Sequence, residues 1–297
     1  MADLPASLRS CSLSFMSLAT RMTSWIRVPP MKRPEQKGLF FETSDAGFCT
    51  NFNQYLYGFI YSLNEDKPLY IYDYANPVAI NYPLIKNTFV DISGVTYTDG
   101  MMASVSSIRR VMPRVMENVR AMPMPTVRAI AQRIFQWNES ILTTLKGIIG
   151  QSLPKSFDLG IHIRVGDRIT TRDKRSIPVQ DYVNAAKKFK KDDMSIFLMS
   201  DSVNAIAEFK KKADPSWKIY TLPSSLPNPD GHLQAQFNRA PSRARLAAYH
   251  SFMAELLVMQ SIPEIISTFS SNVGRFLYYT VEYPERIISL DQKFSVI

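Results

Sequence analysis

The sequence lacks a disulfide framework and a membrane-spanning segment. Its 297 residues include only two cysteines, Cys11 and Cys49, so nothing ties the fold to an oxidising compartment. No uninterrupted apolar stretch approaches the roughly 20 residues that a transmembrane helix needs. We therefore expect a soluble, cytoplasmic protein with no transmembrane segment.

The sequence also lacks a concentrated basic run and an obvious metal motif. Its net charge of +9 favours anionic partners, but no Lys/Arg run interleaved with aromatic residues is present, so we expect no nucleic-acid partner. No Asp-x-Asp motif follows a predicted strand, and Asp192-Asp193 fits a solvated turn. We expect no metal ion and no bound cofactor. The basic residues are scattered, for example Arg109, Arg110, Arg114, Arg120, Arg128 and Arg133.

Length and composition allow two modest α/β domains around separate cores, because 45% of the 297 residues are hydrophobic. Residues 1–34 are rich in Ser and Arg, which fits a flexible leader or an organellar transit peptide. Gly147, Gly150 and Pro154 mark a hinge near residue 150. We therefore expect a leader over 1–34 and domains over 35–150 and 151–297.

The first half begins as nucleotide-type α/β domains usually do. An apolar strand over Leu39–Glu42 precedes a Gly-containing loop at Gly47-Phe48-Cys49, then a helix and a second strand over Leu69–Tyr72. Apolar residues recur at helical spacing from Val127 to Ile148, which predicts one long amphipathic helix over 125–149.

The second half contains the most informative stretch, Gly160 to Arg168. An apolar strand there delivers His162 and Arg164 to its carboxyl end, where open α/β sheets bind ligands. A fixed arginine offers a planar, permanently charged fork to a phosphate, although an isolated pair of this kind is more often a core histidine beside a surface ion pair.

A second strand-to-helix turn runs from Ile265 to Tyr278. A short β-branched strand is followed by Thr268, Phe269, Ser270 and Ser271, and then by a helical pattern. Backbone N–H groups and the positive end of a helix dipole make such a turn an anion site, while the plainer interpretation is an N-cap.

The remaining elements alternate in the pattern of a parallel sheet. We expect a strand over 195–199, a helix over 203–209 capped by Ser200-Asp201, a strand over 217–222, a loop over 223–241 and a helix over 243–260. The segment 223–245, with His232, Arg239, Arg243 and Arg245, either shapes an acceptor site or is solvated surface.

Together these segments resemble the α1,6-fucosyltransferase and protein O-fucosyltransferase group, in the order that the group shows from about Leu39 to Leu290. Its His-x-Arg-Arg-x-Asp-Lys motif resembles His162 to Arg168, and its Ala-Thr-Asp-Asp stretch resembles Met199 to Ser202. Its Thr-Phe-Ser-Ser segment with a following Arg resembles Thr268 to Arg275, and its Gly-aromatic-Gly loop is similar to Gly47 to Cys49.

The resemblance implies an α/β protein of the GT-B architecture, with two Rossmann-like domains facing an interdomain cleft. The N-terminal domain would lie on the acceptor side and the C-terminal domain would bind a nucleotide sugar. Such an enzyme is an inverting, metal-independent glycosyltransferase, and the simplest donor is GDP-fucose, with a glycan or glycoprotein hydroxyl as acceptor.

Residue roles follow from the resemblance and from side-chain chemistry. We expect Arg164 to stabilise the departing diphosphate, and Asp173 or Asp167 to act as general base. The expected donor-binding residues are Gly47, Phe48, Cys49, His162, Arg164, Asp201, Glu255, Thr268, Ser270, Ser271 and Asn272. Tyr182 matches a tyrosine of the group, although its helical spacing also fits a core position.

Four departures from the pattern of the group keep other interpretations open. Val165 replaces a second arginine, Cys49 a glycine and Ser202 an acid, while Glu255 stands where many relatives have an Asp that reads guanine. Another donor such as UDP-xylose is therefore one alternative. A catalytically silent relative that binds carbohydrate or nucleotide is a second, and a basic nucleic-acid binder is a third.

Overall fold

The computed structural model describes residues 38–74, 76, 78, 82–99, 106–150, 153–166, 177–223 and 226–296. The described chain divides into two compact units between Leu142 and Thr143. Each unit contains a wholly parallel sheet with helices, which is the α/β class expected from the sequence.

The N-terminal unit has a four-stranded sheet of order β3-β2-β1-β4. Its strands are β1 (Leu39–Glu42), β2 (Leu69–Tyr72), β3 (Val95–Tyr97) and β4 (Ser106–Ser107), and its helices are α2 (Phe48–Asn64), α3 (Leu84–Thr88), α4 (Ile108–Ala121) and α5 (Met124–Ile134). Helix α2 is buried along most of its length because aromatic side chains such as Phe52 and Tyr55 pack against Phe89 and Phe135.

The single long helix predicted over 125–149 is wrong, because the chain forms α5 and then α6 (Glu139–Ile149). Between them, the backbone at 136–138 leaves the helical path to pair with the segment after α3. The Val90 N–H donates to the Gln136 carbonyl oxygen at 2.9 Å, and the Asn138 N–H donates to the Thr88 carbonyl oxygen at 2.9 Å. The Asn138 side chain then accepts the Ser140 N–H, which starts the new helix.

The C-terminal unit has a five-stranded sheet of order β7-β6-β5-β8-β9, in which every neighbouring pair is parallel. Its strands are β5 (Leu159–Ile163), β6 (Ser195–Ser200), β7 (Lys218–Tyr220), β8 (Ile265–Ser267) and β9 (Ile287–Ser289). Its helices are α7 (Val179–Lys187), α8 (Val203–Lys212), α9 (Gln234–Arg239), α10 (Ser242–Gln260) and α11 (Asn272–Thr280), with a 3₁₀ turn at Pro284–Arg286.

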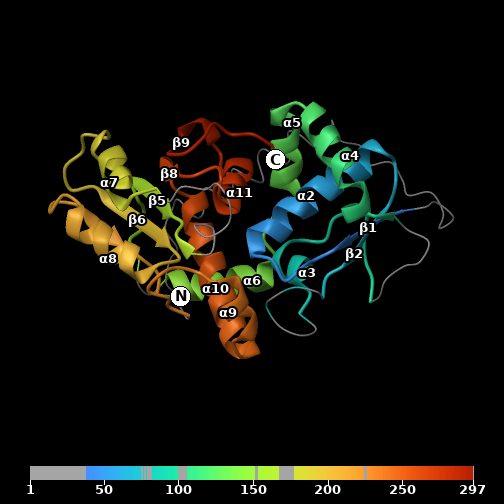
Figure 1. The fold of residues 1–297 in the computed structure, drawn as a ribbon, viewed down its shortest axis with the longest axis horizontal. Coiled ribbons are helices and arrows are strands. Elements are labelled where there is room, and N and C mark those ends of the chain that lie inside the picture. The colour runs from blue at the N-terminus through green and yellow to red at the C-terminus, as the bar shows by residue number, and fades with distance from the viewer. Residues whose placement is uncertain are drawn as a thin grey trace. The chain divides into compact units, whose positions relative to one another are not determined.

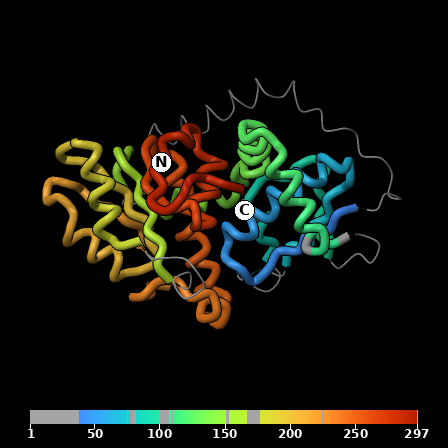
Figure 2. Tube along the Cα trace, turned by 45° about the horizontal axis from the view of Figure 1, so that its top comes forward, coloured from blue at the N-terminus to red at the C-terminus, as the bar shows by residue number. Residues whose placement is uncertain are grey.

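The strand order reverses direction between β5 and β8, and in open α/β sheets ligands bind outside the carboxyl ends of the strands at such a switch point. Helices α7 and α8 lie on one side of this sheet, and α10 and α11 lie on the other, as both views show (Figures 1 and 2). The site of interest is therefore at the ends of β5 and β8.

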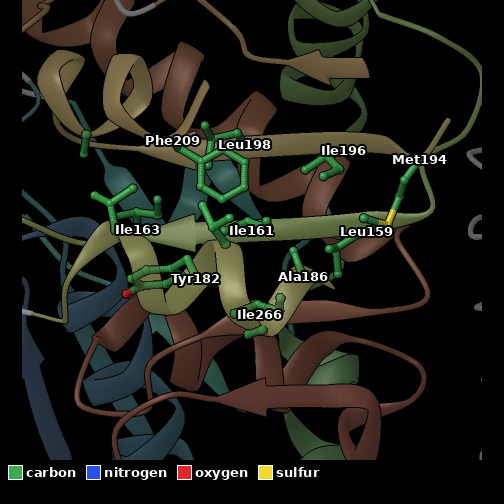
Figure 3. Packing of buried hydrophobic residues seen from close by; sticks show 14 residues of the cluster. Leu159, Ile161, Ile163, Tyr182, Ala186, Met194, Ile196, Leu198, Phe209 and Ile266 are labelled. Carbon is green, nitrogen blue, oxygen red and sulfur yellow. The ribbon is translucent and has the colours of Figure 1, made fainter. Parts of the chain in front are cut away.

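The core between the sheet and the α7–α8 layer fixes the direction in which β5 presents its side chains. Alternate residues Leu159, Ile161 and Ile163 point into a cluster with Tyr182 and Phe209, where all five are at most 1% exposed (Figure 3). Burying each such side chain contributes roughly 2 kcal/mol. Because side chains alternate along a strand, Gly160 and His162 face the opposite side, toward α10 and α11.

Candidate functional site

His162 is the last polar residue of β5 and lies in the interior of the C-terminal unit. Its side chain is 3% exposed, and its Nδ1 lies 3.1 Å from the Ser267 Oγ at the end of the neighbouring strand β8. Burial lowers the pKa of His162 to about 4, the Asp201 carboxylate opposes that shift, and the Arg164 charge adds to it. The imidazole is therefore neutral at pH 7 and offers one donor and one acceptor.

Arg164 follows β5 and is held by Asp201, which follows β6. The Arg164 Nη1 donates to the Asp201 Oδ2 at 2.6 Å, and the two side chains are 22% and 13% exposed. The Asp201 carboxylate also accepts the Val165 N–H at 2.8 Å and the His232 N–H at 3.0 Å. We predicted that Asp201 contacts the nucleotide-sugar donor. In the structure, both of its carboxylate oxygens accept hydrogen bonds from protein groups. The predicted cap of α8 is wrong, because Ser202 accepts the Ala205 N–H.

The loop that carries His232 comes so close to the end of β5 that two glycines are required there. Gly166 and Gly231 both have positive φ, +51° and +97°. A Cβ on Gly231 would lie 2.2 Å from the Gly166 backbone nitrogen, which no side chain allows. Part of the predicted loop over 223–241 is the helix α9. The Ser202 hydroxyl donates to the Pro229 carbonyl oxygen of this loop at 2.6 Å. These contacts hold the loop against the Arg164–Asp201 pair.

Tyr182 belongs to the core and also supports the site. Its side chain is 1% exposed, and its hydroxyl lies at the Ile163 end of β5 (Figure 3). Burial raises the pKa of this hydroxyl, the Asp291 and Asp201 charges raise it further, and a backbone hydrogen bond with Arg164 lowers it. Tyr182 therefore links the hydrophobic core to the residue that we expect to contact phosphate.

The turn between β8 and α11 contains the predicted Thr268, Ser270, Ser271 and Asn272. Ser271 is the N-cap of α11, and its hydroxyl accepts the Val273 N–H at 3.3 Å. A Cβ on Gly274 would lie 2.1 Å from the Thr268 carbonyl oxygen, so the first turn of α11 packs directly on the preceding backbone. The predicted strand-to-helix turn is present, and it stands at the carboxyl end of β8, the strand beside β5.

Asp291 is a site residue that the sequence analysis missed. Its carboxylate accepts the Phe269 N–H at 2.9 Å and the Ser270 N–H at 3.0 Å, which are two of the backbone donors in the predicted anion site. Asp291 lies more than 20 residues further along the chain, after β9, and only the pairing of β9 with β8 brings it here. The local signal was an Asp two residues after a short strand.

Glu255, predicted to read the donor base, is half-buried on α10. Burial and, to a smaller extent, the negative charge of Asp201 raise the pKa of its carboxyl to about 8. The group is therefore mainly protonated at pH 7 and can donate as well as accept a hydrogen bond.

We predict that Glu255→Gln stabilises the protein at alkaline pH. The raised pKa means that the unfolded chain ionises first, so the Glu255 contribution to stability falls as pH rises from about 4.5 to about 8. Glutamine removes that fall, so the unfolding free energy of the variant should exceed that of wild type by a few kcal/mol at pH 9 and match it at pH 5. Urea unfolding at both pH values measures the difference, with the exposed Glu208→Gln as control. A difference that is equal at pH 5 and pH 9 would contradict the prediction.

In the N-terminal unit, the predicted Gly-containing loop is shorter than expected. Gly47 is the N-cap of α2, so Phe48 and Cys49 lie in the first helical turn. The Asn51 side chain ties the preceding segment together, because its Oδ1 accepts the Ser44 N–H at 2.8 Å and its Nδ2 donates to the Ala46 carbonyl oxygen at 3.1 Å. This turn follows β1, which pairs with β2 and β4 inside the N-terminal sheet.

The expected general bases, Asp167 and Asp173, lie outside the described residues. Among the residues that are described, no group of three or more His, Cys, Asp or Glu side chains could hold a metal ion. In that same part of the chain, every helix is too short or too polar to cross a bilayer.

Comparison with known proteins adds to this geometry. No protein-family model matches the sequence, and no curated protein matches it significantly. Among solved structures, the fucosyltransferase NodZ from Bradyrhizobium aligns with a TM-score of 0.58 at 13% identity, over 86% of this chain and 96% of that chain. NodZ α1,6-fucosyltransferase soaked with GDP-fucose gives 0.57 at 13% identity with the same coverage. POFUT1 in complex with GDP gives 0.52 at 10% identity, over 86% of this chain and 99% of that chain.

The protein therefore has a fucosyltransferase-like GT-B fold, as the sequence motifs indicated. The likeness extends over nearly the whole of each solved structure, so the fold is shared from the N-terminal sheet to the C-terminal one.

Proposed function

We propose that the protein is a glycosyltransferase that moves a sugar from a nucleotide diphosphosugar to a glycan hydroxyl, with GDP-fucose as the leading donor. One observation carries the proposal. Arg164 and the Thr268–Ser271 turn follow β5 and β8, the two strands that flank the switch point of the sheet. In a fold whose solved examples bind GDP and GDP-fucose, that is where a diphosphate belongs.

Each residue of the site then has a chemical task. As the bond to the leaving diphosphate breaks, negative charge grows on its oxygens, and the Arg164 guanidinium stabilises that charge. Asp201 binds the Arg164 guanidinium and Tyr182 is hydrogen-bonded to the Arg164 backbone, so the orientation of Arg164 is set before the donor arrives. The neutral imidazole of His162 is held by Ser267 and contributes a fixed dipole to the site. In-line attack by the acceptor hydroxyl inverts the sugar carbon, with Asp173 or Asp167 as its proton acceptor and no metal ion required.

The protonation state of Glu255 determines whether its carboxyl suits a guanine or a uracil base in the donor. Guanine offers two adjacent N–H groups, which need an ionised carboxylate, whereas uracil offers an N–H beside a carbonyl oxygen, which suits a protonated carboxyl. The raised pKa of Glu255 makes a UDP-sugar such as UDP-xylose the second candidate. GDP would have to lower that pKa on binding, so its affinity should increase from pH 6.5 to pH 8.5.

A donor panel tests the proposal. We expect GDP and GDP-fucose to raise the Tm of the wild-type protein by several degrees, in EDTA as well as in Mg²⁺, and GDP-fucose to be turned over. UDP and UDP-xylose serve as competing ligands. Protection by uridine nucleotides alone would reject fucose and keep the reaction class. Nucleotide binding without turnover of any donor would identify a silent relative, and no binding of either nucleotide would reject the proposal.

A further inference from the structure

The segment Ser289–Phe294, which we call the C-terminal strap, lies against the turn that precedes α11. Strand β9 pairs with β8 so that Ser289 stands opposite Ser267, and the Leu290 N–H donates to the Ser267 carbonyl oxygen at 3.0 Å. The next residue, Asp291, therefore arrives beside the turn at the carboxyl end of β8.

The Asp291 carboxylate is saturated with donors, although the residue lies at the surface. Its Oδ1 accepts from the Phe269 N–H at 2.9 Å, the Ser289 hydroxyl at 2.8 Å and the Gln292 N–H at 2.7 Å, and its Oδ2 accepts from the Ser270 N–H at 3.0 Å. Burial would raise the pKa of this carboxyl, but hydrogen bonds from Ser270, Ser289 and Phe269 lower it below its ordinary value. Asp291 is thus a charged clasp between the strap and the turn.

An aromatic anchor holds the other end of the strap. The Phe294 ring stacks on Tyr278 of α11 with centroids 3.7 Å apart and planes 12° apart, and it meets Phe269 edge-on at 5.2 Å. The strap is therefore fixed by strand pairing on one side of Asp291 and by ring packing on the other. The backbone on both sides of Asp291 is therefore held in place, which keeps its carboxylate next to the turn.

The clasp lies at the carboxyl end of β8, the strand that pairs with β5, and Arg164 follows β5. The charges of Asp291 and Asp201 both act on the Tyr182 hydroxyl, which is hydrogen-bonded to the Arg164 backbone. Two consecutive N–H groups of the turn point at Asp291, so they are not available to a donor phosphate. The part of the turn that can bind a phosphate is the start of α11. The orientation of that helix start depends on how the residues before it are held.

We propose that Asp291 is a positioning residue for donor binding: it clasps Phe269 and Ser270 so that the start of α11 faces the diphosphate held by Arg164. The inference rests on the proposed function. Asp291 does not touch the donor, and its effect passes through the turn. Without the clasp the turn samples other conformations, and the donor must order it again on binding.

Graded variants test this role. Asp291→Asn keeps the shape and one acceptor oxygen but sets an NH₂ group against a backbone N–H, whereas Asp291→Ala removes every contact. We expect the Kd for GDP and the KM for the donor to rise about 3-fold in the Asp291→Asn variant and at least 10-fold in the Asp291→Ala variant. In both variants kcat should stay within 3-fold of wild type. Amide exchange at Phe269 and Ser270 should accelerate in the same order. Asp192→Asn, an equal change at an exposed turn, should match wild type. UDP replaces GDP if the donor panel selects it.

The outcomes separate the two ideas. If wild type binds neither nucleotide, the proposed function fails and this inference fails with it. If wild type binds, and Asp291→Ala loses the amide protection yet binds equally well, the positioning role alone is rejected. Tighter binding by Asp291→Ala would show the opposite of our inference, namely a carboxylate that occupies the phosphate position. Asp291→Asn, the milder change, decides the matter if the alanine variant does not fold.

Discussion

Arg164→Ala is expected to lower kcat/KM for the nucleotide-sugar donor by about 10³-fold, the scale of loss seen when an enzyme loses a group that stabilises transition-state charge. The guanidinium is the one cation that the structure, over its described residues, places directly after β5 at the switch point. Its Nη1 is bound to Asp201, which orients the planar guanidinium at the end of β5.

Arg164→Lys separates charge from geometry. Lysine keeps the positive charge but not the fork, so we expect it to recover about 10-fold over alanine while remaining well below wild type. Arg110→Ala, which removes an exposed arginine from α4, is the matched control and should leave kcat/KM unchanged. Steady-state kinetics with the donor chosen by the nucleotide panel measure all three. Retention of more than a tenth of wild-type activity by Arg164→Ala would remove Arg164 from the mechanism.

Asp201→Ala is expected to lower the free energy of unfolding by about 3 kcal/mol and to lower activity as well. The change leaves three donors without their acceptor, namely Arg164, the Val165 N–H and the His232 N–H, and hydrogen bonds to a charged group contribute about 1.5–3 kcal/mol each. The loop that is packed through Gly166 and Gly231 loses its tie to β6, and Arg164 loses its orientation.

Urea denaturation of wild type and variants measures this loss. Asp230→Ala removes an exposed carboxylate from the same loop and should change stability by less than about 0.5 kcal/mol. In the double variant Arg164→Ala/Asp201→Ala the losses should be smaller than the sum of the single losses, because each single change leaves a charged partner behind. Additive losses, or an Asp201→Ala variant as stable as the control, would mean that the pair is only a surface contact.

The sequence patterns located most secondary structure elements well. Strands β1 and β2 have the predicted bounds, and α10 begins one residue before the predicted helix. These elements follow from local periodicity and from Gly or Pro at their ends. The helix predicted over 125–149 failed because its interruption depends on hydrogen bonds to Thr88 and Val90, which lie about 50 residues away and leave no trace in the local pattern.

The residues of the site likewise divide into those that local patterns predict and those that depend on distant parts of the chain. The positions of Arg164 and the Thr268–Ser271 turn could be predicted because residues directly after an apolar strand emerge at its carboxyl end. His162 instead lies inside β5 and is buried. The pairing of Asp201 with Arg164 was not predicted, since a carboxylate after β6 can equally face a ligand, a helix end or a neighbouring guanidinium. Asp291 was missed because nothing near it in the chain indicates that β9 would pair beside β8.

The residue order alone was enough to predict two parallel α/β units and the strand ends at which we expect an anion to bind, since both follow from the alternation of apolar strands and helices along the chain. Tertiary structure decided which groups remain available to a ligand. Asp201 is committed to Arg164 and two backbone N–H groups, Asp291 to Phe269 and Ser270, and Glu255 is kept mainly protonated by burial. Hydrogen-bond partners and desolvation are set by residues that are distant in the chain, so only the packed molecule determines them.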